Sequence, residues 1–478
     1  MTTLSDAHLY MPPAPRIVIY SALAGQLYNL TPGENRPNGT WEQNGCTHLE
    51  DLTEPFLRSL RDLGATHLWL IGLIRHATAT DLGLGEDAPT QNPAIVKGAA
   101  GSPYAVTDYY DIHPTLVRRP RERVQLFTEF LARCHRVGLR LVMDFVPNHV
   151  SREYRSTHLP EGETDLGAED LPDGTPPGGN NFYYLPGQSL TIAFTPGTYY
   201  REYPARATGN DRFTTHLTRD DWYETVKLNY SPVPRTPGGE PPIPSTWLKM
   251  LHILQFWVGL GVDGFRCDMA HMVPTEFWQW AIPQVKAVRP AFFLAELYDT
   301  ALYPAYLRAG FDCLYDKSGL YDRLRAHLQG QPQASNLLRT IEHNRSWGSK
   351  LLYFLENHDE QRLPSPFFAG SPAPGVPAMT LCALSGTASQ MIYFGQELGE
   401  AGTDAEGFSG YDGRTSIFDY YRRDKLNRRA DGGHFPESPS DSEETNRGAV
   451  VTAHLRRAYI RCIGRLHEGL LLSSRSAR

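Results

Sequence analysis

Residues able to do chemistry cluster just after short apolar runs of this 478-residue chain. The clusters are Asp144, Asn148 and His149, then Arg266 and Asp268, then Glu296, and finally Asn357, His358 and Asp359. Any one of these residues alone is an ordinary loop or ion-pair residue. Carboxylates and histidines that converge at strand ends are, however, far more often catalytic than structural. The pattern therefore predicts an active site.

Asp268 and Glu296 end two successive runs, so they would lie on adjacent strands of a barrel. Cleavage of a glycosidic bond with retention needs one carboxylate as nucleophile and one carboxyl as proton donor, about 5–5.5 Å apart. These two residues could meet that separation.

The apolar runs alternate with longer amphipathic stretches, which is typical of βα units around a parallel sheet. Eight runs fit the pattern: IVIY from Ile17, HLWLIG from His67, LRLVMDFV from Leu139, VDGFRCDM from Val262, FFLAEL from Phe292, FDCLYD from Phe311, LLYFLEN from Leu351 and MIYFG from Met391. An open doubly wound sheet is the alternative, but no GxGxxG follows the first run. We expect an α/β fold, an eight-stranded (β/α)8 TIM barrel, whose strand ends share one mouth.

The spacing of apolar residues predicts barrel helices over 120–137 and around 247–258. Residues 151–245, rich in Pro, Gly and Tyr, are too long for a simple connection after the third strand. We therefore expect residues 1–150 to begin the barrel, 151–245 to form an inserted domain B over its mouth, and 246–478 to complete it. A long loop over 401–446 and a last helix over 449–472 would end the chain.

Five segments carry a family resemblance. DFVPNH (144–149), GFRCDMAH (264–271), FLAE (293–296) and ENHD (356–359) resemble the four signature regions of the α-amylase family, glycoside hydrolase family 13. SPYAVTDYYDI (102–112) is similar to the stretch that this family carries before its second helix. They occur in the family's order, and a chance occurrence of all five is very improbable.

The resemblance implies roles for the catalytic residues. Asp268 is the expected nucleophile and Glu296 the acid/base, with a pKa raised by burial and neighbouring carboxylates. Arg266 would hold Asp268 ionised. Asp359 is expected to bind hydroxyls of the distorted sugar ring rather than to attack it.

The resemblance also implies substrate-binding and supporting residues. His149 and His358 would hydrogen-bond the same sugar, with Tyr104 stacked beneath it. His271 stands where many relatives carry a lysine that faces the leaving-group sugar, although a solvent-facing histidine explains it equally well. Asp144 and Asp108 are assigned to structural support, and Asn148 either supports the site or makes a turn.

Two departures from the family pattern bear on calcium and on chain length. Asn148 matches a calcium ligand of many amylases, but Met272 stands where those enzymes have a histidine. We therefore expect no metal and no other cofactor, with calcium possible through domain B carboxylates. Little sequence follows the last helix, so the carboxyl-terminal β domain of the family is expected to be short or absent.

Composition narrows the class of partner. The net charge is −7 and the basic residues are scattered, so no nucleic-acid or membrane footprint is expected. The six cysteines are far apart, which indicates neither disulfides nor a zinc site. The amino terminus has no secretory pattern, so we expect a cytoplasmic protein.

These observations together predict an α-retaining glycoside hydrolase that acts on neutral α-gluco-oligosaccharides, mainly at α-1,4 bonds. A transglycosylase or isomerase with the same site remains an alternative, because both pass through one covalent intermediate. A non-catalytic amylase-like binding protein is the third reading, and the intact carboxylate trio argues against it.

Overall fold

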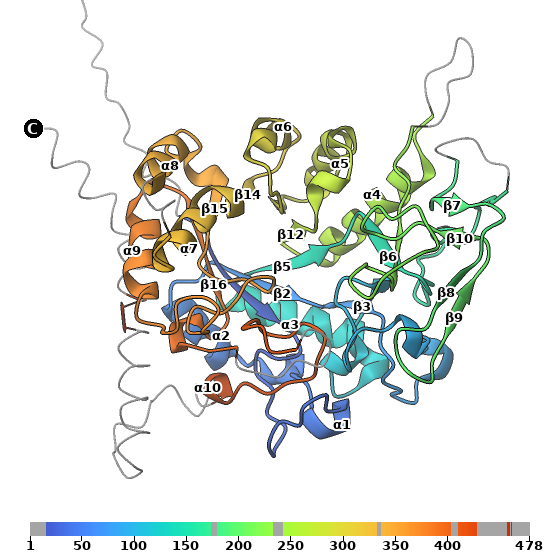
Figure 1. Ribbon diagram of the computed structural model, residues 1–478, viewed down its shortest axis with the longest axis horizontal. Helices are drawn as coiled ribbons and strands as arrows, with labels where there is room; N and C mark the ends of the chain where they lie inside the picture. Colours follow the sequence, from blue (N-terminus) through green and yellow to red (C-terminus); the bar gives the residue numbers. More distant parts are fainter. Residues whose placement is uncertain are drawn as a thin grey trace, which may run out of the picture.

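The computed structural model describes residues 16–173, 179–232, 242–331, 336–402, 410–427, 457–458 and 460. At its centre is a closed barrel of parallel strands in the order β1-β16-β15-β14-β13-β12-β5-β2 (Figure 1). The barrel strands are β1 (Val18–Leu23), β2 (His67–Ile71), β5 (Arg140–Phe145), β12 (Gly264–Cys267), β13 (Phe292–Ala295), β14 (Cys313–Tyr315), β15 (Leu351–Tyr353) and β16 (Ser389–Tyr393). Each of the eight apolar runs overlaps one strand, so the barrel prediction is confirmed.

Helices follow the strands and cover the barrel. They are α1 (Trp41–Asn44), α2 (Glu54–Asp62), α3 (Arg123–Arg136), α4 (Ser245–Leu260), α5 (Thr275–Val288), α6 (Tyr303–Arg308), α7 (Asp322–Leu328), α8 (Leu337–Asn344), α9 (Gly375–Leu384) and α10 (Asp424–Asn427). In α3, the buried residues Phe127, Leu131 and Cys134 recur at helical spacing and face the core, as predicted. Among the helices of the described residues, none has both the length and the apolar character needed to cross a bilayer.

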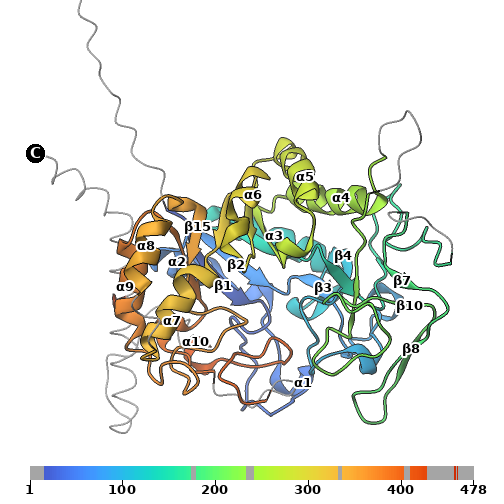
Figure 2. The same cartoon turned by 45° about the horizontal axis from the view of Figure 1, so that its top comes forward.

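Between β5 and α4 the chain forms short strands in place of the regular alternation of strand and helix. These strands are β6 (His149–Ser151), β7 (Tyr184–Leu185), β8 (Leu190–Ile192), β9 (Tyr200–Glu202), β10 (Ala205–Arg206) and β11 (Thr225–Lys227). They form two-stranded antiparallel pairs β6·β11, β7·β10 and β8·β9. In both views β7 and β10 lie on the side of the molecule away from α8 and α9 (Figure 1 and Figure 2).

The segment after β2 also departs from a simple loop. Strands β3 (Ile74–His76) and β4 (Val106–Ile112) pair there before α3 begins. A small apolar cluster joins Ile95 of this segment to Leu190, Ile192, Ala205 and Tyr223 of the inserted strands. The inserted strands thus pack partly on a core of their own.

The sequence also predicted features at the carboxyl-terminal end. The helix expected over 449–472 lies almost entirely outside the described residues, as does much of the 401–446 loop.

Candidate active site

Strand register brings the predicted catalytic residues to one end of the barrel. Arg266 of β12 pairs with Asp144 of β5 and with Leu294 of β13. The amide of Asp268 donates to the Phe145 carbonyl at 2.9 Å, and the amide of Glu296 to the Cys267 carbonyl at 3.2 Å. Asp268 and Glu296 therefore follow directly after adjacent strands, as the sequence predicted.

One guanidinium contacts three carboxylates at this end. Arg266 Nη1 donates to Asp144 Oδ1 at 2.9 Å and to Asp268 Oδ1 at 2.8 Å. Arg266 Nη2 lies 2.5 Å from Glu296 Oε1. The Arg266 side chain is only 1% exposed, so these charge-assisted contacts act with little screening by water.

Burial raises the pKa of both Asp268 and Asp144. It raises the pKa of Asp268 above its usual range, the Arg266 charge opposes the rise, and the Glu296 charge adds to it. Burial also raises the pKa of Asp144 to about 6. The contact expected to keep Asp268 ionised is present, yet Arg266 does not fully offset burial and the neighbouring carboxylates.

A tight turn after Asp268 serves Glu296. Met269 has a φ of 42°, in the left-handed region that residues with a Cβ seldom adopt. Its amide donates to Glu296 Oε2 at 2.7 Å, while the Tyr298 hydroxyl donates to Glu296 Oε1 at 2.8 Å. Both oxygens of the expected acid/base are therefore held in place. Tyr298 was not identified from the sequence, although it stands two residues beyond Glu296.

Asp359 and His358 lie beside Tyr104. The Tyr104 hydroxyl is 2.7 Å from His358 Nε2, which is 3.1 Å from Asp359 Oδ2. Burial lowers the pKa of His358 to about 3, so its ring is neutral at ordinary pH. The Asn357 side chain accepts the Asp359 amide at 2.9 Å and fixes the turn that presents Asp359. The Asp359 side chain is 43% exposed and remains accessible to a ligand.

A cavity of about 290 Å³ opens over these groups. It lies near the lower end of the size range of small-molecule sites. Six of the predicted residues line it: Tyr104, His149, Asp268, Glu296, His358 and Asp359. Arg266 and Asp144 are buried behind this lining and hold it through their hydrogen bonds.

Residues 49–287, half of the chain, match the family described as alpha amylase, catalytic domain. The chain belongs to the α-amylase family. It is similar to the alpha-amylase MalA of Haloarcula japonica, with 26% identity over 323 residues that span 67% of this chain and 40% of that protein. The cyclomaltodextrinase of Geobacillus thermopakistaniensis is 22% identical over 316 residues, spanning 64% of this chain and 46% of the relative. The chain thus spans about half the length of these curated relatives, or less.

A solved structure supports the same fold assignment. The cyclic alpha-maltosyl-(1→6)-maltose hydrolase from Arthrobacter globiformis, in complex with maltose, superposes with a TM-score of 0.56 and 18% identity. The match covers 93% of this chain and 84% of that structure. At this identity the likeness establishes the shared barrel architecture.

The position where many amylases bind calcium is filled by an ammonium group in this amylase-family chain. Lys227 Nζ donates to Asn148 Oδ1 at 2.6 Å and lies 2.6 Å from Asp211 Oδ1. The amide nitrogen of Asn148 donates to the Gly209 carbonyl at 2.7 Å. A calcium ion needs six to eight oxygen ligands, and the Asn148 oxygen already accepts from a cation. The residues around Asn148 therefore do not fit a calcium ion, and the Asn148 amide nitrogen lies 3.2 Å from His149 Nδ1.

His271 is half-buried and does not belong to the cavity lining. Its ring lies 6.0 Å from that of Tyr298, whose hydroxyl bonds Glu296. His271 Nδ1 is buried and has no hydrogen-bond partner among the described residues. The structure therefore places His271 beside Tyr298, which bonds the expected acid/base, and a contact of His271 with the leaving-group sugar stays a prediction.

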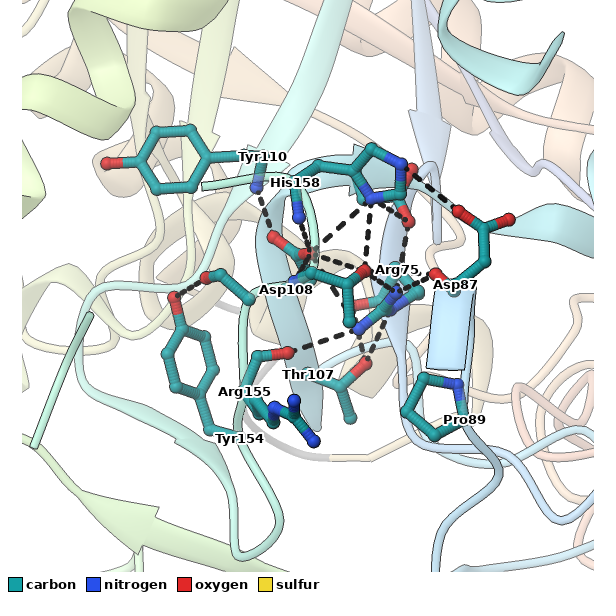
Figure 3. Close-up of polar contacts among 12 residues, drawn as sticks. Arg75, Asp87, Pro89, Thr107, Asp108, Tyr110, Tyr154, Arg155 and His158 are labelled. Atoms are coloured by element: carbon teal, nitrogen blue, oxygen red, sulfur yellow. Dashed lines mark hydrogen bonds and ion pairs between the residues drawn. The ribbon is translucent and has the colours of Figure 1, made fainter. Parts of the chain in front are cut away.

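Asp108 belongs to an ion-pair network rather than to the cavity (Figure 3). Its Oδ2 accepts the amides of Thr157 and His158 at 2.7 and 3.2 Å, and Arg75 Nη2 lies 3.7 Å away. Asp108, Asp111 and His158 offer ligand atoms within 4.8 Å of one another, the geometry of a possible metal site.

Guanidinium groups already take up the acceptors of that cluster. Both oxygens of Asp111 accept from Arg123, at 2.7 and 2.9 Å, and Arg75 lies 3.2 Å away. The network joins β3, β4 and α3 to residues 157–158. Asp108 therefore has the supporting position expected of it.

Among the aromatic residues of the inserted segment, Trp222 lines the cavity, and its ring lies 5.1 Å from that of His149. Phe194 and Tyr200 pack on the small apolar cluster of the insertion instead. Tyr183 packs against Phe213, and Tyr199 is exposed. For most of these rings, packing within the insertion explains their presence.

Two further kinds of site residue carry no signal that the sequence pattern could show. Trp69 of β2 donates from Nε1 to Asp144 Oδ2 at 3.0 Å, and its ring faces Arg266. A tryptophan in an apolar run is usually a core residue, and nothing in the run indicates that its ring nitrogen donates to a carboxylate. Lys97 and Glu224 also line the cavity, but they come from irregular segments that no strand pattern locates.

Proposed function

We propose that this chain is an α-retaining glycoside hydrolase that uses Asp268 as nucleophile and Glu296 as acid/base. The observation that carries the proposal is the single Arg266 guanidinium, bonded to Asp268 and paired with Glu296 at the floor of a sugar-sized cavity. Such a pair matches the two-carboxylate requirement of retention.

The first step forms a bond and breaks a bond at the anomeric carbon. An Asp268 oxygen attacks this carbon as the glycosidic C–O bond breaks, and Glu296 gives its proton to the departing oxygen. Arg266 balances the charge that moves between the two acids. Neutral His358 and the partly exposed Asp359 are placed to hydrogen-bond hydroxyls of the sugar as it flattens.

The second step reverses these roles. Glu296, now ionised, takes a proton from a water molecule whose oxygen attacks the same carbon and displaces Asp268. The two inversions restore the α configuration. A sugar hydroxyl in place of water would give transglycosylation from the same intermediate.

We infer a neutral α-1,4-linked gluco-oligosaccharide as substrate. The support is the kind of relative that the chain resembles, an alpha-amylase and a cyclomaltodextrinase, together with a maltose-bound hydrolase of the same fold. The cavity lining carries opposite charges, including those of Lys97 and Glu224, and such a lining also suits an uncharged ligand.

We propose further that the enzyme works without calcium, because the Lys227 ammonium already binds the Asn148 oxygen. This ammonium supplies a positive charge where many relatives would use a metal.

The experiment that tests the proposed function follows the anomeric configuration of the product. Wild-type protein incubated with maltodextrin should release the α-anomer first, as seen by proton NMR before mutarotation. Asp268→Asn should lower turnover by several orders of magnitude without loss of folding. Initial release of the β-anomer, or near-normal activity of Asp268→Asn, would overturn the assignment.

A further inference from the structure

One wall of the cavity carries an ion pair that the proposed mechanism does not use. Lys97 follows the short helix η3 (Pro93–Ile95), and Glu224 directly precedes β11. Lys97 Nζ lies 3.0 Å from Glu224 Oε2, and both residues line the cavity that contains Asp268 and Glu296. They are about 95% buried, so solvent screens the pair only weakly.

A buried ion pair is stable only when its remaining hydrogen-bonding capacity is met. Lys97 Nζ also donates to the Asp221 carbonyl at 3.1 Å and lies over the Tyr223 ring. Glu224 is different, since its Oε2 is buried against the Lys97 ammonium while its Oε1 makes no hydrogen bond with any described residue. A carboxylate offers about four acceptor positions. Glu224 thus has unused acceptor capacity at the cavity surface.

The pair lies on the same wall as two groups already placed near the sugar. The Trp222 ring packs against the ring of His149, and β11 pairs with β6, which begins at His149. The backbone of Glu224 is fixed there, because its carbonyl accepts the amide of Arg152 at 3.0 Å. Glu224 is therefore held at a defined place in the wall of the cavity that His149 also lines, and it is not a mobile surface acid.

A donor and an acceptor side by side match two neighbouring hydroxyl groups of a sugar ring. Each hydroxyl can donate one hydrogen bond and accept others, so one oxygen can accept from the ammonium while the next donates to the carboxylate. The opposite charges cancel, which favours a neutral polyol over an anionic one. A buried polar pair of this kind also rejects an analogue that lacks the matching hydroxyl, because its groups are then left unpaired.

We propose that Lys97 and Glu224 determine sugar specificity by binding two adjacent hydroxyl groups of the ring next to His149. Lys97 donates to one hydroxyl oxygen, and Glu224 accepts from the other. This inference rests on the proposed function, since it needs a sugar in the cavity.

The test uses α-D-glucosyl fluoride and its monodeoxy analogues, each lacking one ring hydroxyl. Fluoride release needs only the ring that Asp268 attacks, so chain length plays no part. Wild-type protein should lose about tenfold or more in kcat/KM with one or two of these analogues. Glu224→Gln and Lys97→Met should lose activity on the parent sugar but lose little further activity on those same analogues.

Matched controls come from an ion pair at the opposite end of the barrel. Lys286 and Asp312 lie 2.8 Å apart, with Asp312 just before β14. Lys286→Met and Asp312→Asn should keep the wild-type response to every analogue. Circular dichroism checks folding, and if Lys97→Met does not fold, Glu224→Gln decides the question.

The inference is overturned if every analogue loses the same factor in Glu224→Gln as in wild type. Wild-type protein that releases no fluoride from any sugar in the series gives a different result, which rejects the proposed function and this inference with it.

Discussion

At the scale of single residues, Arg266 sets the charge balance of the active site. Its guanidinium contacts Asp144, Asp268 and Glu296 at 2.5–2.9 Å. One positive charge cannot stabilise three buried carboxylates equally, so the group as a whole favours keeping a proton. Burial raises the pKa of Asp268, the Arg266 charge only partly offsets the rise, and the charges of Glu296 and Asp144 add to it. In the proposed mechanism the proton belongs on Glu296, where the leaving oxygen needs it.

The role of Glu296 can be separated from that of Asp268 by choice of leaving group. Glu296→Gln should lower kcat on maltotriose by about 10²–10⁴-fold, the usual contribution of a general acid. The first step on α-D-glucosyl fluoride should be much less affected, because fluoride departs without a proton. Stopped-flow measurement of fluoride release compares the two substrates directly.

Asp268→Asn is the matched control, since loss of the nucleophile should abolish turnover of both substrates. Equal loss on maltotriose and on the fluoride in Glu296→Gln would show that Glu296 does not act as the proton donor.

The positions of the site residues were predictable from sequence where the residues lie at the end of a strand. Asp268 and Glu296 were found because each directly follows an apolar run, and the structure places both at the mouth of the barrel. Lys97 and Glu224 were not found, because they meet only when two irregular segments pack together. Local pattern cannot report such a contact.

At the scale of elements, the β6·β11 pair joins the insertion to the barrel. Lys227 pairs with His149 in this ladder, and its ammonium bonds the Asn148 side chain. Strand β11 therefore positions the cavity residue His149 and supplies the Lys227 ammonium that bonds the neighbouring Asn148. The insertion was predictable from its length, whereas this ladder depends on long-range pairing.

This arrangement leads to a prediction about calcium. Exhaustive chelation of the wild-type protein should change neither kcat nor melting temperature, because the ammonium occupies the cation position. Lys227→Met should lower both, since it leaves Asn148 and Asp211 without their cation. Differential scanning calorimetry and maltodextrin assays measure the two effects.

Lys286→Met again serves as the control, because that lysine is remote from β11. A wild-type enzyme that loses activity on chelation and regains it with added calcium would refute the prediction.

At the scale of the whole molecule, the barrel was predictable from the sequence. The regular alternation of apolar runs with amphipathic stretches, and the length of the chain, were enough to indicate it. Eight apolar runs separated by amphipathic stretches leave few alternatives to a closed parallel sheet. Details of pairing in the insertion, and the Arg75 and Arg123 network beneath it, were not predictable. They depend on groups that meet only when separate segments of the chain pack together, as Arg75 and Asp108 do.

Buried histidines give the whole molecule a pH dependence. Burial lowers the pKa of His67, His149 and His358 to about 3, against an ordinary value of 6.5. Below pH 6.5 the unfolded chain binds protons at these rings and the folded chain does not. The free energy of unfolding therefore falls as the pH drops from about 6.5 towards 3, and this loss is absent above 6.5.

His67 offers the cleanest test, because it lies at the start of β2, at the end of the barrel opposite the cavity. Its ring packs near Phe292, and its Nε2 has no hydrogen-bond partner among the described residues. His67→Phe should keep catalytic activity. Between pH 4 and 6 it should reduce the slope of the unfolding free energy against pH by about 1.4 kcal/mol per pH unit, the amount that corresponds to one proton. Urea unfolding at a series of pH values measures this slope. An unchanged slope would mean that His67 takes up a proton in the folded protein, and that its burial does not exclude the charged form.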